Sequence, residues 1–246
     1  WDEAQRMLAK AELTTADAEL ARALLQARRH ASADHPQQVL DTLAGVVERF
    51  PRQQLALDLV AQAQRALADW NALAKLLPRL KDAKVYPGAE LHALETAVHA
   101  GRIAQAALTS AEQEPAERQR NLEALWSTVP KALRNAPAVM ASYVDAWQRL
   151  GDAARAEAEL RRYLSEHWDA GLMLRYGRIK GADSALQLTV AEGWVRRWPD
   201  RPEVLLTLGR LCVANKLWGK ARDYLERCLR LAPSADVYGE LAALME

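Results

Sequence analysis

The sequence has few of the features on which most enzymes and disulfide-stabilised proteins depend. Only two cysteines occur in 246 residues, without a CxxC pair or a disulfide framework, and this mildly favours a reducing compartment. A glycine-rich phosphate loop is missing, as are HExxH and GxSxG motifs. The carboxylates are scattered beside arginines rather than paired as an acid and a base. We therefore expect the protein not to be an enzyme.

Long apolar runs and an excess of one charge are also absent. No stretch approaches the roughly 18 apolar residues of a membrane helix, and no signal peptide is visible. The formal net charge is +1, which gives no general basic field for nucleic acid. Because the chain begins with Trp1 rather than Met, we expect it to be a fragment of a longer protein.

The residues that dominate the sequence favour helix. Alanine, leucine, arginine and glutamate are abundant, whereas phenylalanine occurs once and glycine 11 times. No strand-like alternation of apolar and polar residues extends over any length. The sequence therefore predicts an all-α protein.

The stretch 202–233 shows the organisation most clearly. Two amphipathic helices are expected, at 203–214 and 218–231, with a short turn at 215–217. Small and apolar residues recur at defined positions of this stretch, and a proline closes it: Leu205, Leu208, Gly209, Cys212, Ala221, Leu225, Cys228 and Pro233. This is the position pattern of a tetratricopeptide repeat (TPR), a helix–turn–helix unit of about 34 residues.

Several of these positions have a physical reason. Gly209 and Ala221 are small, so the two helices can approach closely where they cross. The two cysteines fall at core positions, where we interpret them as small buried hydrophobes. One hairpin cannot bury its apolar face alone, so the pattern predicts a stack of hairpins, an α-solenoid.

The rest of the chain repeats this pattern less faithfully. We expect a single TPR solenoid over residues 1–246, with six or seven hairpins including partial ones. It comprises N-terminal repeats (1–77), a degenerate, irregular middle (78–136) and C-terminal repeats (137–246). Residues 1–13 are predicted as the second helix of a hairpin. Residues 78–87, which begin with Pro78, are interpreted as a short helical end and an irregular connection. Residues 89–111 are expected to be strongly helical, as one element or as two that meet near Gly101.

In a TPR stack the first helix of each repeat lines a concave groove, at roughly positions 2, 5, 9 and 12. The candidates for partner binding in these slots are charged: Arg28, Arg65, Arg178, Arg210, Asp58 and Asp145. The remaining slots hold Leu24, Gln62, Gln148, Leu174, Glu203, Leu206 and Val213. Arginines here suit the carboxylates of a ligand or an acidic peptide. A solvated inner face is the alternative. The eight tryptophans are better interpreted as packing between helices than as an aromatic binding box.

Two histidines are candidate haem ligands. His92 and His99 are seven residues apart on one helix face, and both fall in the groove if Leu91 takes position 4. Neutral imidazoles can ligate iron or zinc. Two helical turns separate them, however, so they could not easily hold one metal from the same side. Exposed or packed histidines are the alternative, and we predict no metal site.

The segment 205–226 resembles the C-terminal hallmark of HemY-type proteins. Its core is the run from Asn215 to Tyr224, and the Trp198-Pro199-x-x-Pro202 run before it resembles the family too. The opening Trp-x-x-Ala-x-x-x-Leu adds to the resemblance. These are membrane-anchored TPR proteins of Gram-negative bacteria associated with haem and porphyrin biosynthesis. The resemblance is specific in the last 50 or so residues. In the rest of the chain it extends only to the arrangement of alanine-rich helices, a degenerate middle and better-formed repeats.

The resemblance implies a function. Two membrane helices would precede Trp1, and the TPR region would face the cytoplasm at the inner membrane. Its role would be a non-catalytic scaffold or regulator that binds enzymes of late haem biosynthesis, and the family has no catalytic residue to transfer. Two alternatives remain: a carrier or sensor that binds haem or porphyrin itself, and a peptide-binding TPR adaptor unrelated to haem.

Overall fold

The computed structural model describes residues 15–109 and 114–244 of the chain. Within these residues every regular element is a helix, so the predicted all-α class is confirmed. Contacts divide the chain into two compact units, Trp1–Arg102 (unit 1) and Ile103–Glu246 (unit 2). None of the described helices combines the length and the apolar character needed to cross a membrane. The helix predicted over residues 1–13 lies outside the described residues.

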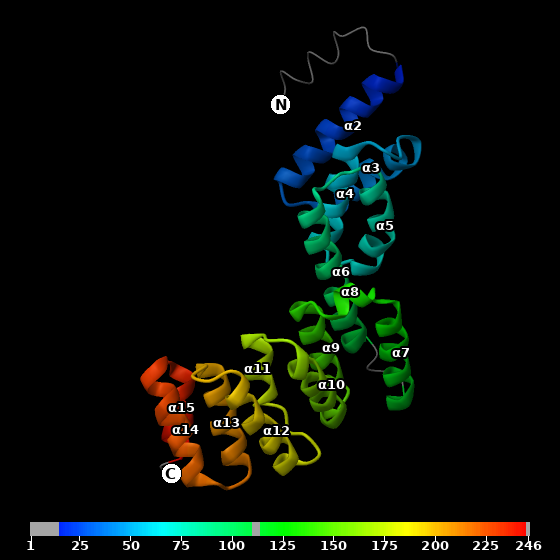
Figure 1. Cartoon of the computed structure of the whole chain (residues 1–246). Coiled ribbons are helices and arrows are strands. Elements are labelled where there is room, and N and C mark those ends of the chain that lie inside the picture. Colours follow the sequence, from blue (N-terminus) through cyan, green and yellow to red (C-terminus); the bar gives the residue numbers. More distant parts are fainter. Residues whose placement is uncertain (1–14, 110–113, 245–246) are drawn as a thin grey trace. The chain divides into compact units, whose positions relative to one another are not determined.

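Unit 1 contains successive antiparallel helices, seen in blue to green in Figure 1. They are α2 (Thr15–Ser32), α3 (Pro36–Arg49), α4 (Gln54–Ala66), α5 (Trp70–Asp82) and the part of α6 (Gly88–Thr109) up to Arg102. Helix α4 contacts α3 before it and α5 after it, and α2 also contacts α4. Contact between alternate helices as well as consecutive ones is the packing of stacked hairpins.

Unit 2 continues the same architecture. Its helices are α7 (Pro115–Thr128), α8 (Lys131–Arg134), α9 (Pro137–Arg149), α10 (Ala153–Glu166), α11 (Ala170–Tyr176), α12 (Ser184–Arg197), α13 (Pro202–Ala214), α14 (Trp218–Leu231) and α15 (Ala235–Ala243). Helices α13 and α14 pack together along the predicted repeat, and α13 also contacts the alternate helices α11 and α15. The chain is therefore a TPR-like helical-repeat protein.

Local sequence explains where these helices begin and how the hairpins turn. Five helices start after an Asp or Ser whose side chain accepts a hydrogen bond from a main-chain N–H of the first turn: Asp69, Asp152, Asp169, Asp183 and Ser234. Such a cap contributes about 1 kcal/mol. The turn inside a hairpin places one residue at positive φ, at Ala68 (53°), Gly151 (83°) and Lys216 (59°). Lys216 lies in the turn that the sequence predicts at 215–217.

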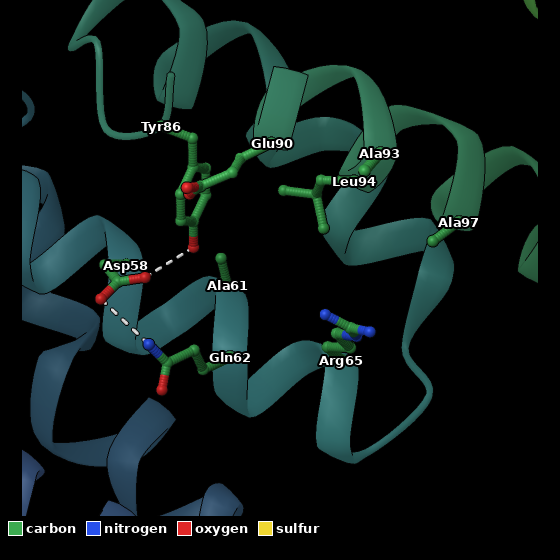
Figure 2. A pocket seen from close by; sticks show the side chains of 9 residues that line it. All are labelled: Asp58, Ala61, Gln62, Arg65, Tyr86, Glu90, Ala93, Leu94 and Ala97. Atoms are coloured by element: carbon green, nitrogen blue, oxygen red, sulfur yellow. Dashed lines mark hydrogen bonds between the residues drawn. The ribbon is translucent and has the colours of Figure 1, made fainter. Parts of the chain in front are cut away.

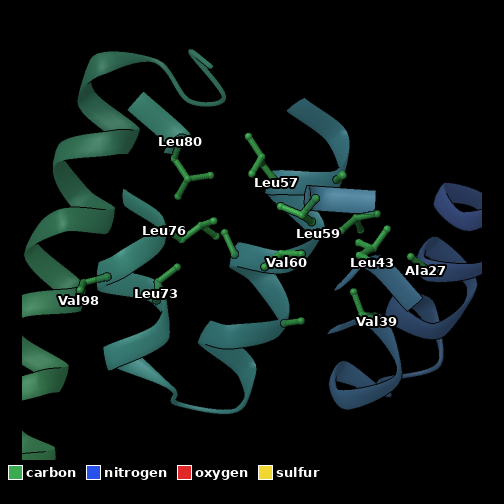
Figure 3. Close-up of a cluster of buried hydrophobic side chains, with 14 residues drawn as sticks. Ala27, Val39, Leu43, Leu57, Leu59, Val60, Leu73, Leu76, Leu80 and Val98 are labelled. Atoms are coloured by element: carbon green, nitrogen blue, oxygen red, sulfur yellow. The ribbon is translucent and has the colours of Figure 1, made fainter. Parts of the chain in front are cut away.

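The core of unit 1 comes from all of its described helices. Its fully buried leucines include Leu43, Leu57, Leu73 and Leu80, and Val98 of α6 closes the cluster (Figure 3). Burying each leucine contributes about 1.5–3 kcal/mol. The core is therefore continuous through successive hairpins, as a repeat array requires.

Helices α13 and α14 approach closely at Gly209. A Cβ atom on Gly209 would lie 2.5 Å from Cδ2 of Leu225, which is fully buried. Ala221, Cys212 and Cys228 are also buried, and both cysteines are free thiols. The predicted roles of Gly209, Ala221 and the two cysteines are confirmed.

Helices α5 and α6 continue through both places where the sequence suggests a break. Pro78 lies inside α5, which continues to Asp82, because the turn beyond the proline is held by the core and by a neighbour. Leu80 is fully buried there, and Nη2 of Arg79 donates to the carbonyl of Val47 at 2.6 Å. Likewise α6 runs through Gly101 without a break.

Glycine is required at position 101 for packing. A Cβ there would lie 2.3 Å from the indole of Trp70 on α5. The boundary between the two units falls one residue beyond this contact, inside α6.

Candidate functional site

A pocket in unit 1 lies between two first helices of successive hairpins. It has a volume of about 450 Å³ and we call it the α4–α6 pocket (Figure 2). Its lining residues are Asp58, Ala61, Gln62, Arg65, Tyr86, Glu90, Ala93, Leu94 and Ala97. The volume lies within the range of about 300–1,000 Å³ that ligand pockets span. The structure thus brings together three residues that the sequence assigns to the groove, Asp58, Gln62 and Arg65.

Helix periodicity explains the composition of each wall. On α4 the lining residues are spaced by three and four, so they share one face of the helix. The same spacing holds for Glu90, Ala93, Leu94 and Ala97 on α6. Three alanines and one leucine form the apolar part of the lining, and the charged residues flank it.

Tyr86 connects the two walls. It belongs to the segment between α5 and α6, and its hydroxyl donates to Oδ1 of Asp58 at 2.6 Å. The other carboxylate oxygen of Asp58 accepts from Nε2 of Gln62 at 3.0 Å. Burial, and then the hydrogen bond to Asp58, raises the pKa of Tyr86 well above its ordinary value, so the phenol stays a donor. Gln54 supports the same segment by donating to the carbonyl of Ala83 at 2.8 Å.

Two charged side chains of the pocket have no partner. The exposed guanidinium of Arg65 and the exposed carboxylate of Glu90 form no hydrogen bond or ion pair with any residue that the structure describes. Figure 2 shows Glu90 beside Tyr86 and Arg65 farther along α4, with Ala61 and Leu94 between them. These two groups are therefore available to a ligand.

The partner-binding candidates predicted in unit 2, unlike Arg65, form ion pairs within the protein. Arg175 of α11 binds Asp145 of α9 with Nη2 and Oδ2 3.1 Å apart. Asp236 of α15 accepts from Arg178 at 2.7 Å and from Arg210 at 3.0 Å. Arg210, whose side chain is only 8% exposed, also donates to Glu240 at 2.6 Å.

The pairs Arg175–Asp145 and Arg210–Asp236 join first helices of successive hairpins. The hydrogen bond from Arg210, followed by the charge of Arg178, lowers the pKa of Asp236. Arg178, Arg210 and Asp145 thus have partners inside the protein. Arg28 on α2 is exposed and does not line the α4–α6 pocket.

The two candidate haem ligands lie in different environments. His92 is exposed, whereas His99 is 9% exposed and its Nδ1 is buried without a hydrogen-bond partner. Burial lowers the pKa of His99 and favours the neutral imidazole. Neither residue lines the α4–α6 pocket. Among the residues described, no group of three or more His, Cys, Asp or Glu side chains is arranged to hold a metal ion.

The rotation of α6 explains why Glu90 was missed. With Leu91 at position 4, the predicted groove face of α6 contains His92 and His99, about one residue away from the lining face. The close packing of Gly101 on Trp70 sets this rotation. This contact joins residues of two different helices, so the periodicity of α6 alone does not indicate it. Tyr86 lies in the connection between α5 and α6, which has no periodic spacing of apolar residues. The sequence therefore gives no indication that Tyr86 lines the pocket.

A second cavity, of about 570 Å³, lies in unit 2 among α7, α9 and α10. Trp126 stacks on Tyr143 there with ring centroids 3.9 Å apart. Arg155 is paired with Glu123 at 3.6 Å and with Glu159 at 3.2 Å. Lys131 and Glu166 also line this cavity, and both are exposed and form no ion pair or hydrogen bond with the described residues. The α4–α6 pocket differs in being lined by three residues that the sequence assigns to the groove.

Comparison with known proteins leaves the function open. No model of a protein family matches the chain, and no curated protein matches it. Chains of solved structures do match, among them one from a structure of Naa15/Naa10 bound to HypK-THB. That match has 15% identity and a TM-score of 0.43, and it covers 100% of this chain but only 36% of the other. Neither value is high enough to transfer a function.

Proposed function

We propose that this protein is a non-catalytic scaffold that binds a protein partner through the α4–α6 pocket. The observation that carries the proposal is the pair of unpaired charges, Arg65 and Glu90, beside an apolar floor. Charged side chains that face a pocket without an internal partner gain most from a ligand, because they then form charge-assisted hydrogen bonds. First helices of successive hairpins supply both walls, so the pocket is continuous with the repeat architecture.

We further propose that the partners are enzymes of late haem biosynthesis at the bacterial inner membrane, with this region facing the cytoplasm. The support is the sequence resemblance of segment 205–226 to HemY-type proteins. That segment forms α13, α14 and their turn in unit 2. The partner class therefore rests on the resemblance, whereas the binding surface rests on the pocket.

Capture of partners from Gram-negative bacterial membranes tests both parts. The bait is the chain itself, compared with Arg65→Glu and with Lys75→Glu as the matched control. Lys75 is exposed on α5 outside the pocket, and its substitution changes the charge by the same amount. We expect the chain and Lys75→Glu to retain late haem-pathway enzymes and Arg65→Glu to lose them. Equal recovery by all three would refute the pocket as the binding surface, and a set of partners without any such enzyme would refute the partner class.

The proposal that haem itself binds has one supporting observation. The orphan Nδ1 of His99 belongs to an imidazole that burial keeps neutral, which is the form that ligates iron. Titration of haem into the chain should then give a saturable Soret shift that is lost in His99→Ala and weakened in His92→Ala. An unchanged shift in both variants would exclude these two ligands.

A further inference from the structure

The α4–α6 pocket has opposite charges at its two ends. Asp58 begins the lining face of α4 and Arg65 ends it, seven residues later. Glu90 begins the lining face of α6 and lies on the side of Tyr86 and Asp58 (Figure 2). Seven residues of α-helix rise about 10 Å. An acidic end and a basic end are therefore separated by about 10 Å.

The two acidic side chains at one end differ in availability. Asp58 already accepts hydrogen bonds from Tyr86 and Gln62 through both of its oxygens. Glu90 forms none with the residues that the structure describes. Asp58 thus positions the wall and adds negative charge, and Glu90 is the group that a cation can reach.

The floor between the ends suits small side chains. Ala61, Ala93 and Ala97 line it with small side chains, and Leu94 adds one larger apolar side chain. Small residues let a peptide backbone approach both helices. An extended chain advances about 3.3 Å per residue, so three residues cover the 10 Å between the charged ends.

Resting on the proposed function, we infer that the α4–α6 pocket binds an extended peptide segment with a basic and an acidic residue three positions apart. Small apolar residues lie between them. The basic residue pairs with Glu90, and the acidic residue pairs with the guanidinium of Arg65, whose planar fork accommodates a carboxylate. The groove arginines of unit 2 are less suited, because Arg178 and Arg210 already bind Asp236.

The test uses the full chain and capped hexapeptides of Ala and Gly that carry one Lys and one Glu. The separation of Lys and Glu runs from one to five positions, in both orders, and fluorescence polarisation measures the affinity. We expect one order to bind best, at a separation of three. Changing either peptide charge to a neutral residue should weaken binding about three- to tenfold, which corresponds to about 0.7–1.4 kcal/mol.

Paired substitutions identify which end holds which charge. In the Arg65→Gln variant, neutralising the peptide's Glu should no longer lower the affinity, whereas neutralising its Lys still should. In the Glu90→Gln variant, neutralising the Lys should have no effect and neutralising the Glu should lower the affinity. The matched controls are Lys75→Gln and Glu48→Gln, at exposed positions of α5 and α3 outside the pocket, and both should preserve the full preference.

Affinity that is independent of charge separation, or of these two substitutions, would overturn the inference. If partner capture still depends on Arg65 in that case, the proposed function survives without it. If Arg65→Glu leaves partner capture unchanged while the peptides show the expected preference, the pocket binds such peptides but is not the surface that binds the physiological partner.

Discussion

At the scale of single residues, one glycine determines how closely the best-formed hairpin packs. A methyl group on Gly209 would overlap Cγ and Cδ2 of Leu225, which is fully buried. Gly209→Ala should therefore lower the free energy of unfolding by about 1–3 kcal/mol, despite the better helix propensity of alanine. Urea denaturation measures this. Gly193→Ala in α12 is the control, since nothing lies within 4 Å of its added Cβ, and it should be neutral or stabilising by up to about 1 kcal/mol.

The two thiols offer a second test at this scale. Burial raises the pKa of the Cys212 thiol to about 11, and burial also raises that of Cys228. Since the thiolate is the reactive form, both should react with a disulfide reagent at pH 8 on the order of a hundredfold more slowly in the native protein than in urea. Rapid labelling of the native protein would show that α13 and α14 do not pack as described.

A glycine contact can be predicted from the sequence when both residues belong to the same repeat. The Gly209 contact lies within one repeat, so position spacing alone predicts it. The Gly101 contact joins α6 to Trp70 of the preceding helix, and its closeness depends on the rotation of both helices. A junction near Gly101 was therefore one of the two predicted alternatives, although this glycine is a packing position inside a continuous helix.

At the scale of elements, ion pairs hold α15 against its neighbours. Asp236 accepts from Arg210 on α13 and from Arg178, which follows α11. Its lowered pKa means that its contribution to stability is present above the unfolded-chain value of about 3.9 and is lost as the pH falls through the folded value. Asp236→Asn should therefore be less stable than the parent at pH 7, and the difference should shrink towards pH 3.

Urea denaturation across this pH range measures the difference between the two proteins. Asp223→Asn is the matched control, because Asp223 is exposed on α14 and forms no ion pair or hydrogen bond with the described residues. The control should show no such pH dependence. A constant deficit for Asp236→Asn would mean that its carboxylate does not act through these arginines.

Helix boundaries and helix rotations were not equally predictable. Capping aspartates mark the helix starts after Asp69 and Asp152, so these boundaries follow from local sequence. Residues 78–87 were predicted only as a short helical end and a connection. Burial of Leu80 and the bond from Arg79 to α3 stabilise that helical end despite the missing donor of the proline. Tertiary packing thus determines where this helix ends, although the proline by itself favours an earlier end.

At the scale of the whole molecule, the two units should respond separately to destabilisation. In a repeat array each hairpin contacts only its neighbours, so a local defect spreads over a limited distance. Gly209→Ala should raise amide hydrogen exchange in α13 and α14 and leave that of α3 and α4 unchanged. Mass spectrometry of exchanged peptides measures this. A uniform increase in both units would mean that the chain unfolds as one cooperative body.

The fold was more predictable than the candidate site. Repeat spacing determines the class of fold, and the register of α4 was sufficient to place Asp58, Gln62 and Arg65 in the pocket. Tyr86 and Glu90 depend on a non-periodic connection and on the rotation of α6, which a contact between helices sets. The internal pairing of Arg178 and Arg210 was not predicted either, because their acidic partners come from α15.

Site-specific photocrosslinking in living bacteria tests the central claim most directly. A photoreactive amino acid is placed in the chain at Ala93, which is exposed in the α4–α6 pocket, or at Lys75 outside it. We predict a discrete adduct with a partner protein from position 93 that Arg65→Gln diminishes, and none from position 75. An equal adduct from position 75, or one from position 93 that is unaffected by Arg65→Gln, would contradict the assignment of this pocket as the binding surface.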